Sequence, residues 1–240
     1  QLSGKKLSFN NYNDLYSALL ISKSLPNNKG TVIVKHANPC GVSINKNKIK
    51  SFKLALKCDP ISAYGGVVSF NFKINKILAL ELKKIFLEIV IGNGFDKEAI
   101  KILKKKKNLR IIDSSKLNLR DTLNISSGLS TLLIQSTDFK KFTKKDFVVV
   151  SKSKPSKKIL DNLIFAFNVC RFVKSNAIVL TQNFSTVGIG SGQPSRIDSC
   201  KIAVDKMNSC QSINNKDAVY AASDAFFPFV DGIEQLVQSG

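Results

Sequence analysis

The chain has 240 residues, 43% of them hydrophobic, and a formal net charge of +20. This length and apolar content are typical of a globular protein with one large domain or two small ones. The longest uncharged stretch, residues 175–195, is rich in Thr, Ser, Asn and Gly, which excludes a membrane span there. No signal peptide opens the chain, and we expect a cytoplasmic protein.

The first half of the chain predicts alternating helices and strands, which indicates an α/β fold. A turn and a helix are expected within residues 5–24, and the β-branched run at 31–34 predicts a buried strand. Apolar residues three and four positions apart predict an amphipathic helix over 74–86. The other elements expected here are helices at 52–56 and 96–107 and strands at 67–70, 88–91 and 109–112.

The second half opens on a polar stretch, residues 113–130, which predicts a loop. Residues 151–155 are the best candidate for a linker, and we place a domain boundary there, between 1–150 and 151–240. Pro155 is suited to open a helix. The other elements expected are strands at 131–134, 147–150, 175–180 and 218–222, a hairpin strand at 184–188, a helix around 197–207 and a last helix after Gly232.

The two halves share a weak echo. In each, a strand leads to a glycine-containing turn and a helix, and then to an Asp-led loop with an Ala and an aromatic residue. These loops are residues 59–64 and 224–229. The echo suggests that an α/β unit was duplicated.

The residues Lys35 to Gly41, Lys-His-Ala-Asn-Pro-Cys-Gly, follow the first predicted strand. Pro and Gly favour a turn, so we expect Asn38 to Gly41 to end the strand. This places Lys35 and His36 at a strand end, where α/β proteins often bind ligands. His36 is the only histidine. It is either a general base with Lys35 beside it or a structural histidine.

Two further stretches have both a functional and a structural interpretation. Gly188-x-Gly190-x-Gly192 lets a ligand approach backbone N–H groups at a helix start, with Arg196 as an anion ligand, or it is only a tight turn. Phe226-Phe227-Pro228-Phe229 forms either a slot for a flat ring or part of the core.

Metal and thiol chemistry are poorly supported. One histidine and five cysteines without Cys-x-x-Cys spacing do not make a zinc set, and a zinc deaminase would need a second cysteine where Ser43 stands. A Cys40–His36 protease pair lacks an orienting partner. The odd number of cysteines favours reduced thiols.

The charge leaves a second class of function open. A net charge of +20 is typical of a protein that binds nucleic acid, so a basic RNA-binding module is the alternative. However, only four of the 37 basic residues are arginine, and the lysine runs lack interleaved aromatic residues for base stacking. Codon bias from an AT-rich genome explains this composition better, and we expect no specific nucleic-acid partner.

Five motifs in order resemble the AICAR transformylase family, which forms the C-terminal half of a bifunctional enzyme that also carries IMP cyclohydrolase. Besides Lys35–Gly41, they are Asp59-Pro-Ile-Ser-Ala-Tyr-Gly-Gly66, Lys174-Ser-Asn-Ala177, Val187–Arg196 and Ala222-Ser-Asp-Ala-Phe-Phe-Pro-Phe229. The resemblance covers nearly the whole chain. It implies formyl transfer from 10-formyltetrahydrofolate to the 5-amino group of AICAR, giving formyl-AICAR in purine biosynthesis.

The resemblance also implies residue roles. His36 would accept the proton and Lys35 would stabilise the oxyanion. The AICAR ligands would be Gly65, Glu88, Asn176, Arg196 and Phe226. Ile197, Asp231, Pro228 and Phe229 would contact the folate.

The family fold is two zinc-free, cytidine-deaminase-like α/β subdomains in a homodimer, so no metal is implied. The chain departs from the family in having Val230 where an Arg is common. The nucleotide-binding segments expected before Gln1 and after Gly240, and the cyclohydrolase half, are absent from this sequence. We therefore expect a fragment of a longer protein, with the second subdomain truncated.

Overall fold

The computed structural model describes residues 1–117, 123–138, 140, 142–210, 213–214 and 216–239. Side-chain caps define several helix starts in the first half: Ser8, Asn47 and Asn75 each accept a backbone N–H of the helix that follows. The elements of this half are α1 (Phe9–Ser24), β1 (Gly30–Lys35), β2 (Asn38–Ile44), α2 (Lys48–Cys58), α3 (Pro60–Ala63), β3 (Val67–Phe70), α4 (Lys76–Lys83), β4 (Ile89–Gly92), α5 (Lys97–Lys104) and β5 (Arg110–Asp113).

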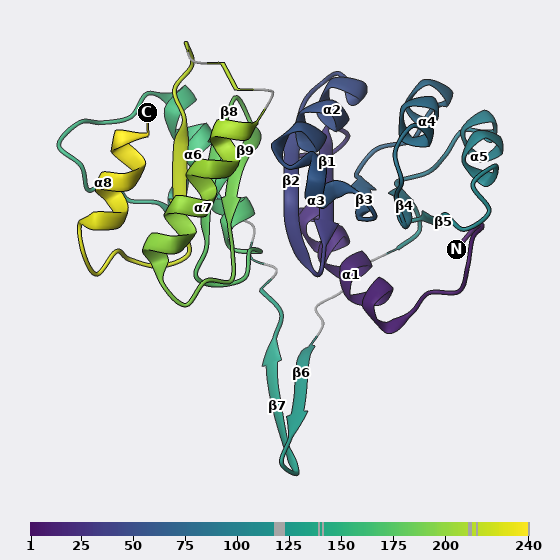
Figure 1. The fold of residues 1–240 in the computed structure, drawn as a ribbon, viewed down its shortest axis with the longest axis horizontal. Coiled ribbons are helices and arrows are strands. Elements are labelled where there is room, and N and C mark those ends of the chain that lie inside the picture. The colour runs from purple at the N-terminus through teal and green to yellow at the C-terminus, as the bar shows by residue number, and fades with distance from the viewer. Residues whose placement is uncertain (118–122, 139, 141, 211–212, 215, 240) are drawn as a thin grey trace.

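A separate hairpin follows, made of β6 (Leu123–Gly128) and β7 (Thr131–Ser136), which projects away from the rest of the molecule (Figure 1). A 3-10 turn, η1 (Lys144–Asp146), leads into the remaining elements. These are α6 (Lys157–Cys170), β8 (Ile178–Gln182), β9 (Ser185–Gly190), α7 (Arg196–Ser209), β10 (Tyr220–Ser223) and α8 (Asp231–Gln238).

The body of the protein is one eight-stranded mixed sheet with strand order β10-β8-β9-β2-β1-β3-β4-β5. Strands β3, β4 and β5 are parallel, and the other neighbours pair antiparallel. The two halves meet at β2 and β9, where Ser43 pairs with Ser185 and the Ile44 N–H donates to the Phe184 carbonyl at 2.9 Å. The mixed α/β class predicted from the sequence is confirmed.

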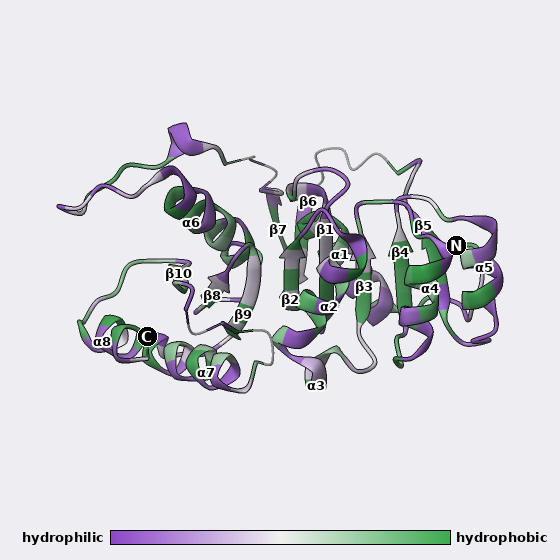
Figure 2. Cartoon of the chain, turned by 90° about the horizontal axis from the view of Figure 1, so that it is seen from above, coloured by the Kyte–Doolittle hydropathy of each residue, from purple (hydrophilic) through white to green (hydrophobic). Residues whose placement is uncertain are grey.

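Helices cover both faces of this sheet. One core cluster runs under α1 and α6 and joins the halves, since it contains Val34 and Val42 from one and Phe165 and Val179 from the other. On the opposite face, α2, α4 and α5 cover the first half, and α7 and α8 cover the second. Figure 2 shows α6 on one side of the β8–β9 strands and α7 and α8 on the other.

The same order of elements occurs twice: helix, two-strand hairpin, helix, strand. It is α1-β1-β2-α2-β3 in the first half, apart from the short α3, and α6-β8-β9-α7-β10 in the second. In each half a glycine of the second hairpin strand packs against the following helix. A Cβ at Gly41 would lie 1.9 Å from the Ala55 carbonyl oxygen, and one at Gly188 would lie 2.0 Å from that of Ala203.

The Asp-led loops that suggest the echo in the sequence are not equivalent in this order. Asp59 ends α2 and precedes β3, whereas Asp224 follows β10. The correspondence lies in the hairpins and in the helices that pack on them.

The prediction that Asn38 to Gly41 forms the turn is wrong. The turn is His36–Ala37, and Asn38 already pairs with Lys35 as the first residue of β2. Pro39 is accommodated because the β1–β2 register shifts between Ile33 and Val34, and proline is tolerated at such irregularities.

Two further predictions fail in the middle of the chain. Residues 147–150 form no strand: Val148 and Val150 are 84% and 95% exposed and have no neighbouring strand. The loop predicted for 113–130 instead contains β6, although its residues 118–122 lie outside the described part of the chain. Residues 147–150 have strand propensity but no strand to pair with. The polar β6 segment forms a strand because it pairs with β7.

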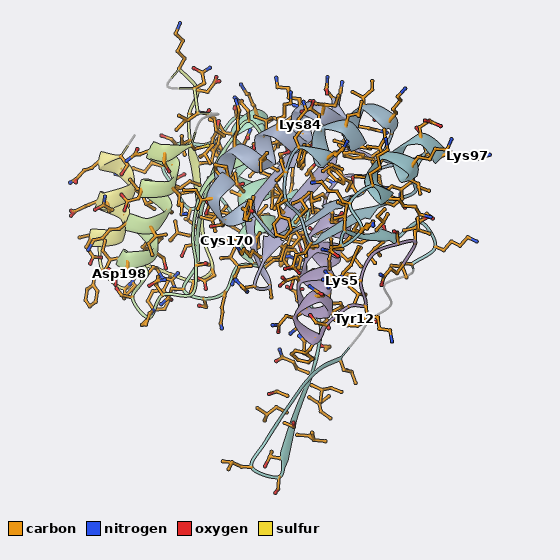
Figure 3. All side chains as sticks on the ribbon, turned by 45° about the vertical axis from the view of Figure 1, so that its right-hand side comes forward. Lys5, Tyr12, Lys84, Lys97, Cys170 and Asp198 are labelled. Atoms are coloured by element: carbon orange, nitrogen blue, oxygen red, sulfur yellow. The ribbon has the colours of Figure 1, made fainter. Side chains whose placement is uncertain are left out.

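Most lysines lie on the surface. Figure 3 shows the labelled Lys97 pointing outward from α5, and both Lys84 and Lys97 are exposed, whereas Cys170 lies inside. No helix in the described ranges has the length and apolar character needed to cross a membrane.

Candidate active site

The two residues that turn β1 into β2 are His36 and Ala37. Their φ angles are 53° and 60°, and two positive values in a two-residue hairpin are typical of a type I′ turn. Side chains with a Cβ adopt this region at a cost of about 1–3 kcal/mol each. Asp14 stabilises the turn by accepting the Ala37 N–H at 2.6 Å. The turn presents the exposed imidazole of His36 beside Lys35.

Lys35 is held in place by α3. Its Nζ donates to the Tyr64 carbonyl at 2.9 Å. The next residue, Gly65, has φ 74° and donates its N–H to the Phe86 carbonyl at 2.9 Å. A side chain at Gly65 would be strained at this φ and would meet the Phe86 ring at 3.3 Å. Lys35, at the end of β1, and Gly65, just before the antiparallel β3, therefore lie at the same end of these neighbouring strands.

Glu88 directly precedes β4, so it lies at the same end of the strands as Gly65. Its N–H donates to the Gly66 carbonyl at 3.0 Å. One carboxylate oxygen accepts the Asn11 side-chain amide at 2.8 Å and lies 3.7 Å from an Arg110 guanidinium nitrogen. These contacts hold the Glu88 carboxylate at the end of the strands where Lys35 also lies.

A pocket of about 340 Å³ opens between the β1–β2 turn and α7. Lys35 and His36 line it from the first half. Ser191 and Gln193, which follow β9, and Lys206 of α7 line it from the second. The other lining residues are Asn38, Pro39, Cys40, Cys58, Asp59, Ser62, Ile189 and Ile202. The pocket thus forms at the junction of the two halves. The prediction of a single turn at Gly188–Gly192 is wrong, because Gly188 and Gly190 lie in β9 and pack closely against α7.

A second group of expected site residues surrounds Arg196 at the start of α7. Its Nη2 donates to the Asn176 side-chain oxygen at 2.7 Å, and its Nη1 donates to the Ser223 hydroxyl at 2.8 Å and forms an ion pair with Asp224. The Asn176 amide in turn donates to the Gln193 carbonyl at 2.9 Å. This network therefore adjoins the pocket through Gln193.

The Asp224 carboxylate is the anionic centre of this network. Burial alone would raise its pKa, but hydrogen bonds from Ser175, Arg196 and the Ala177 N–H outweigh that effect and leave the pKa below its ordinary value. The side chains of Arg196 and Asp224 are only 12% and 15% exposed. The guanidinium is thereby locked in one orientation with its donors largely engaged.

The phenylalanine run after β10 does not form a closed slot in this chain. Phe226 and Phe229 are 79% and 73% exposed. Phe227 instead turns inward, with its ring 6.0 Å from the Arg196 guanidinium carbon and against Gly232. The expected ring-binding surface is therefore open.

The other expected folate residues lie around the starts of α7 and α8. Ile197 is half-buried in the first turn of α7. Pro228 and Asp231 are exposed, and Asp231 accepts the Gly232 N–H at 2.7 Å. Ile197, Pro228 and Asp231 are not among the described residues that line the junction pocket.

The structure therefore places the expected site residues in two neighbouring groups. Lys35, Gly65 and Glu88 lie at the same end of strands β1, β3 and β4, with His36 beside Lys35. Asn176, Arg196 and the start of the phenylalanine run form the other. The imidazole shares the pocket with Ser191 and Gln193, which follow β9, whereas the phenylalanine run lies outside it.

The pocket also contains a thiol, Cys40. Burial raises its pKa to about 12, and the nearby Asp59 adds to the shift, while Lys35 and Lys206 oppose it. A thiol with such a pKa remains protonated at neutral pH, and the thiolate is the nucleophilic form. The raised pKa of Cys40 therefore disfavours a Cys40–His36 nucleophilic pair.

Sequence reasoning missed one pair in this pocket, Asp59 and Lys206. Their charged atoms lie 2.7 Å apart. Asp59 belongs to a motif that we singled out, but Lys206 is one of many lysines, and no local pattern connects two residues so far apart in the chain. No cluster of three or more His, Cys, Asp and Glu that could hold a metal occurs within the residues placed by the structure.

Comparison with known proteins bears on this site. Residues 1–206 match the family model described as AICARFT/IMPCHase bienzyme. The chain belongs to this family. Relatives named bifunctional purine biosynthesis protein PurH are 43% identical over 241 residues in Leptospira biflexa, 42% over 259 residues in Prochlorococcus marinus strain MIT 9515 and 44% over 246 residues in Buchnera aphidicola subsp. Schizaphis graminum.

In each case the match covers 100% of this chain but only 46%, 49% and 46% of the relative, respectively. The chain thus spans about half the length of its AICARFT/IMPCHase bienzyme relatives. Membership in the family confirms the coarser part of the resemblance, namely that the chain is related to the AICARFT/IMPCHase bienzyme proteins. It does not by itself divide the two activities in the family description between the parts of the longer proteins.

Proposed function

We propose that this chain is the formyl-transfer part of a bifunctional purine-biosynthesis enzyme. It transfers the formyl group of 10-formyltetrahydrofolate to the 5-amino group of AICAR, and formyl-AICAR is the product. The longer protein also carries IMP cyclohydrolase. The observation that carries this proposal is the Lys35–His36 turn, which presents an ammonium and an imidazole side by side in a junction pocket of a family member.

The chemistry requires a base and an oxyanion stabiliser. The aromatic amine of AICAR is a poor nucleophile, so its proton must leave as the nitrogen attacks the formyl carbon. His36 accepts that proton, since an imidazole is suited to general base catalysis near neutral pH. Lys35 stabilises the negative charge that develops on the formyl oxygen in the tetrahedral intermediate. Collapse of this intermediate breaks the bond between the formyl carbon and N10 of the folate, and the proton taken up by His36 passes to N10. Tetrahydrofolate leaves, and the formyl group stays on AICAR.

AICAR is held by Gly65, Glu88, Asn176, Arg196 and Phe226. Their arrangement supports this role in part. Lys35 bonds the carbonyl of the residue before Gly65, the Glu88 N–H bonds the carbonyl of the residue after it, and Asn176 and Arg196 bond to each other. The folate contacts Ile197, Pro228, Phe229 and Asp231, where an exposed aromatic ring beside a carboxylate suits a flat, polar pterin. Val230 provides no charge there.

The fold is proposed to be two zinc-free, cytidine-deaminase-like subdomains related by duplication, divided near residue 150. The repeated order of helix, hairpin, helix and strand supports this, as do the matching contacts of Gly41 and Gly188. The two corresponding hairpin turns, His36–Ala37 and Asn183–Phe184, also both have paired positive φ values.

We also propose a cytoplasmic homodimer with active sites near the subunit interface. The β6–β7 hairpin supports a contact between two copies. Ile125 and Ile134 pair directly and are 63% and 58% exposed, with Leu123 and Leu132 on the same face. Residues 123–136 contain no charge in a chain of net charge +20, so two copies repel each other least there. Covering this face also stabilises a hairpin that is marginal alone.

The test is product formation by the purified full-length protein. With AICAR and 10-formyltetrahydrofolate, we expect formyl-AICAR, identified by mass spectrometry, and a matching amount of tetrahydrofolate. Absence of product would remove the proposal. If the same protein then bound RNA with an affinity that falls steeply with salt, the basic RNA-binding module would replace it.

A further inference from the structure

The junction pocket contains an ion pair that the proposed chemistry does not use. Lys206 Nζ on α7 lies 2.7 Å from Asp59 Oδ2, and the two residues are 147 positions apart. Their side chains are 35% and 12% exposed. Of the ion pairs between residues that the structure places, only this one joins residues 1–113 to residues 157–239.

Asp59 uses the rest of its carboxylate to begin α3. Oδ1 accepts the Ser62 N–H at 3.0 Å, and Oδ2 accepts the Ser62 hydroxyl at 2.6 Å. Burial would raise the pKa of Asp59, yet the bonds from Lys206 and Ser62 leave it below its ordinary value, so the group is an anion. A helix of four residues cannot stabilise itself in isolation, so this cap, together with the burial of Ala63 in the core, places α3.

The other end of α3 contacts Lys35. Tyr64 is its C-terminal cap, and the Tyr64 carbonyl accepts the Lys35 Nζ hydrogen bond. A continuous series of contacts thus runs from Lys206 to Asp59, through α3 to Tyr64, and on to Lys35. It begins on α7 of the second half and ends at the group proposed to stabilise the oxyanion.

We propose that Lys206 is a positioning residue whose ion pair with Asp59 holds α3 so that the Tyr64 carbonyl fixes the Lys35 ammonium in the pocket. The catalytic consequence rests on the proposed function. Without Lys206, Asp59 becomes an uncompensated anion in the same pocket as Lys35. The Lys35 ammonium then pairs with the Asp59 carboxylate. It moves away from the position at which the formyl oxygen develops negative charge.

The first readout is structural and needs no activity. Crystal structures of the full-length protein are compared for the wild type, Lys206→Met and Lys201→Met. Lys201 is the matched control, because it lies on the same helix, is 56% exposed and pairs only with Asp198 one turn away. We expect the Lys35–Tyr64 contact to be lost in Lys206→Met and kept in Lys201→Met. If it persists in Lys206→Met, the positioning role is refuted.

The second readout is kinetic. We expect Lys206→Met to lower kcat about tenfold to a hundredfold, as misplacement of a catalytic group by about 1 Å does, with the Kd for AICAR nearly unchanged. The melting temperature should also fall, because Asp59 loses its cation, so kcat is measured at a temperature at which the variant is folded. The double variant Asp59→Asn/Lys206→Met recovers part of kcat, because the competing carboxylate is gone. A lower melting temperature with unchanged kcat indicates a purely structural ion pair and overturns the proposal.

The two readouts separate this inference from the proposed function. If the wild-type protein makes no formyl-AICAR, the proposed function fails, while the Lys35–Tyr64 contact still decides whether Lys206 positions Lys35. If the wild type is active and Lys206→Met breaks the contact without a loss of kcat, the role of Lys206 in catalysis is refuted and the formyl transfer stands.

Discussion

At the scale of single residues, the candidate site is built from side chains whose polar atoms are already engaged. Arg196 bonds Asn176, Ser223 and Asp224, and Lys35 bonds the Tyr64 carbonyl. Such contacts fix the direction of each donor before a substrate arrives. Pre-organised donors are the main source of electrostatic stabilisation in enzyme sites. His36 differs, because its backbone is held in the turn while its ring is exposed.

The Arg196–Asp224 pair should contribute strongly to stability. Arg196→Met leaves the largely buried Asp224 carboxylate without its cation, and we expect the free energy of unfolding in urea to fall by about 3 kcal/mol. Lys201→Met, which removes an exposed ion pair, should change it by less than about 0.5 kcal/mol. Equal effects of the two variants would show that the Arg196 network is not structurally important.

The depressed pKa of Asp59 has a defined consequence for stability against pH. A carboxyl whose pKa is lower in the folded state stabilises the protein above its unfolded value, and that contribution is lost as pH falls through the folded pKa. The ordinary value here is 3.8. The difference in unfolding free energy between wild type and Asp59→Asn should therefore be largest above about pH 4 and should shrink at lower pH. A difference that stays constant from pH 6 to pH 2 would contradict this.

At the scale of elements, close approach of strand and helix decides the packing on both sides of the junction. Gly188→Ala would force a Cβ to within 2.0 Å of the Ala203 carbonyl oxygen, and we expect a loss of about 3 kcal/mol in unfolding free energy. Gly128→Ala is the control, since nothing lies within 4 Å of the added Cβ. It should change stability by less than about 0.5 kcal/mol. Similar losses in both variants would contradict the packing account.

The elements also show what local sequence can and cannot reveal. Strands β1, β3 and β4 are predictable because their apolar and β-branched runs are local, and helices α4 to α7 are predictable from local sequence as well. The start of β2 was missed because Asn38-Pro39-Cys40-Gly41 has turn chemistry, while its strand conformation depends on a register shift in β1 and on close contact with α2. Residues 147–150 have strand propensity but no partner. The contact of Asp59 with Lys206 depends on the meeting of β2 and β9, which no local pattern contains.

At the scale of the whole molecule, the candidate site lies where two similar halves meet in one sheet. The shared core under α1 and α6 makes the junction rigid, so residues from both halves can form one pocket. The expected AICAR and folate residues extend beyond that pocket onto open surface around Phe226 and Phe229. The homodimer that we propose is argued from a different surface, the β6–β7 hairpin.

The hairpin provides a test of that homodimer. Ile125→Asn and Ile134→Asn remove apolar side chains from the exposed face that the proposed dimer covers, and each should weaken dimerisation at least about tenfold, since burying such a side chain contributes about 1.5–3 kcal/mol. Leu133→Asn changes the opposite face at similar exposure, 68%, and should leave the dimer intact. Analytical ultracentrifugation measures all three variants. A dimer unaffected by either isoleucine variant would exclude this face.

The central claim is that His36 is the base of formyl transfer, and its most direct measurement is turnover by the full-length His36→Asn variant. Asparagine tolerates the positive φ of this turn, and Ala37→Gly is the control that relaxes the neighbouring position. We predict that His36→Asn lowers kcat at least about a hundredfold and leaves the Kd for AICAR within about threefold, while Ala37→Gly retains turnover. Unchanged kcat in His36→Asn would contradict the account.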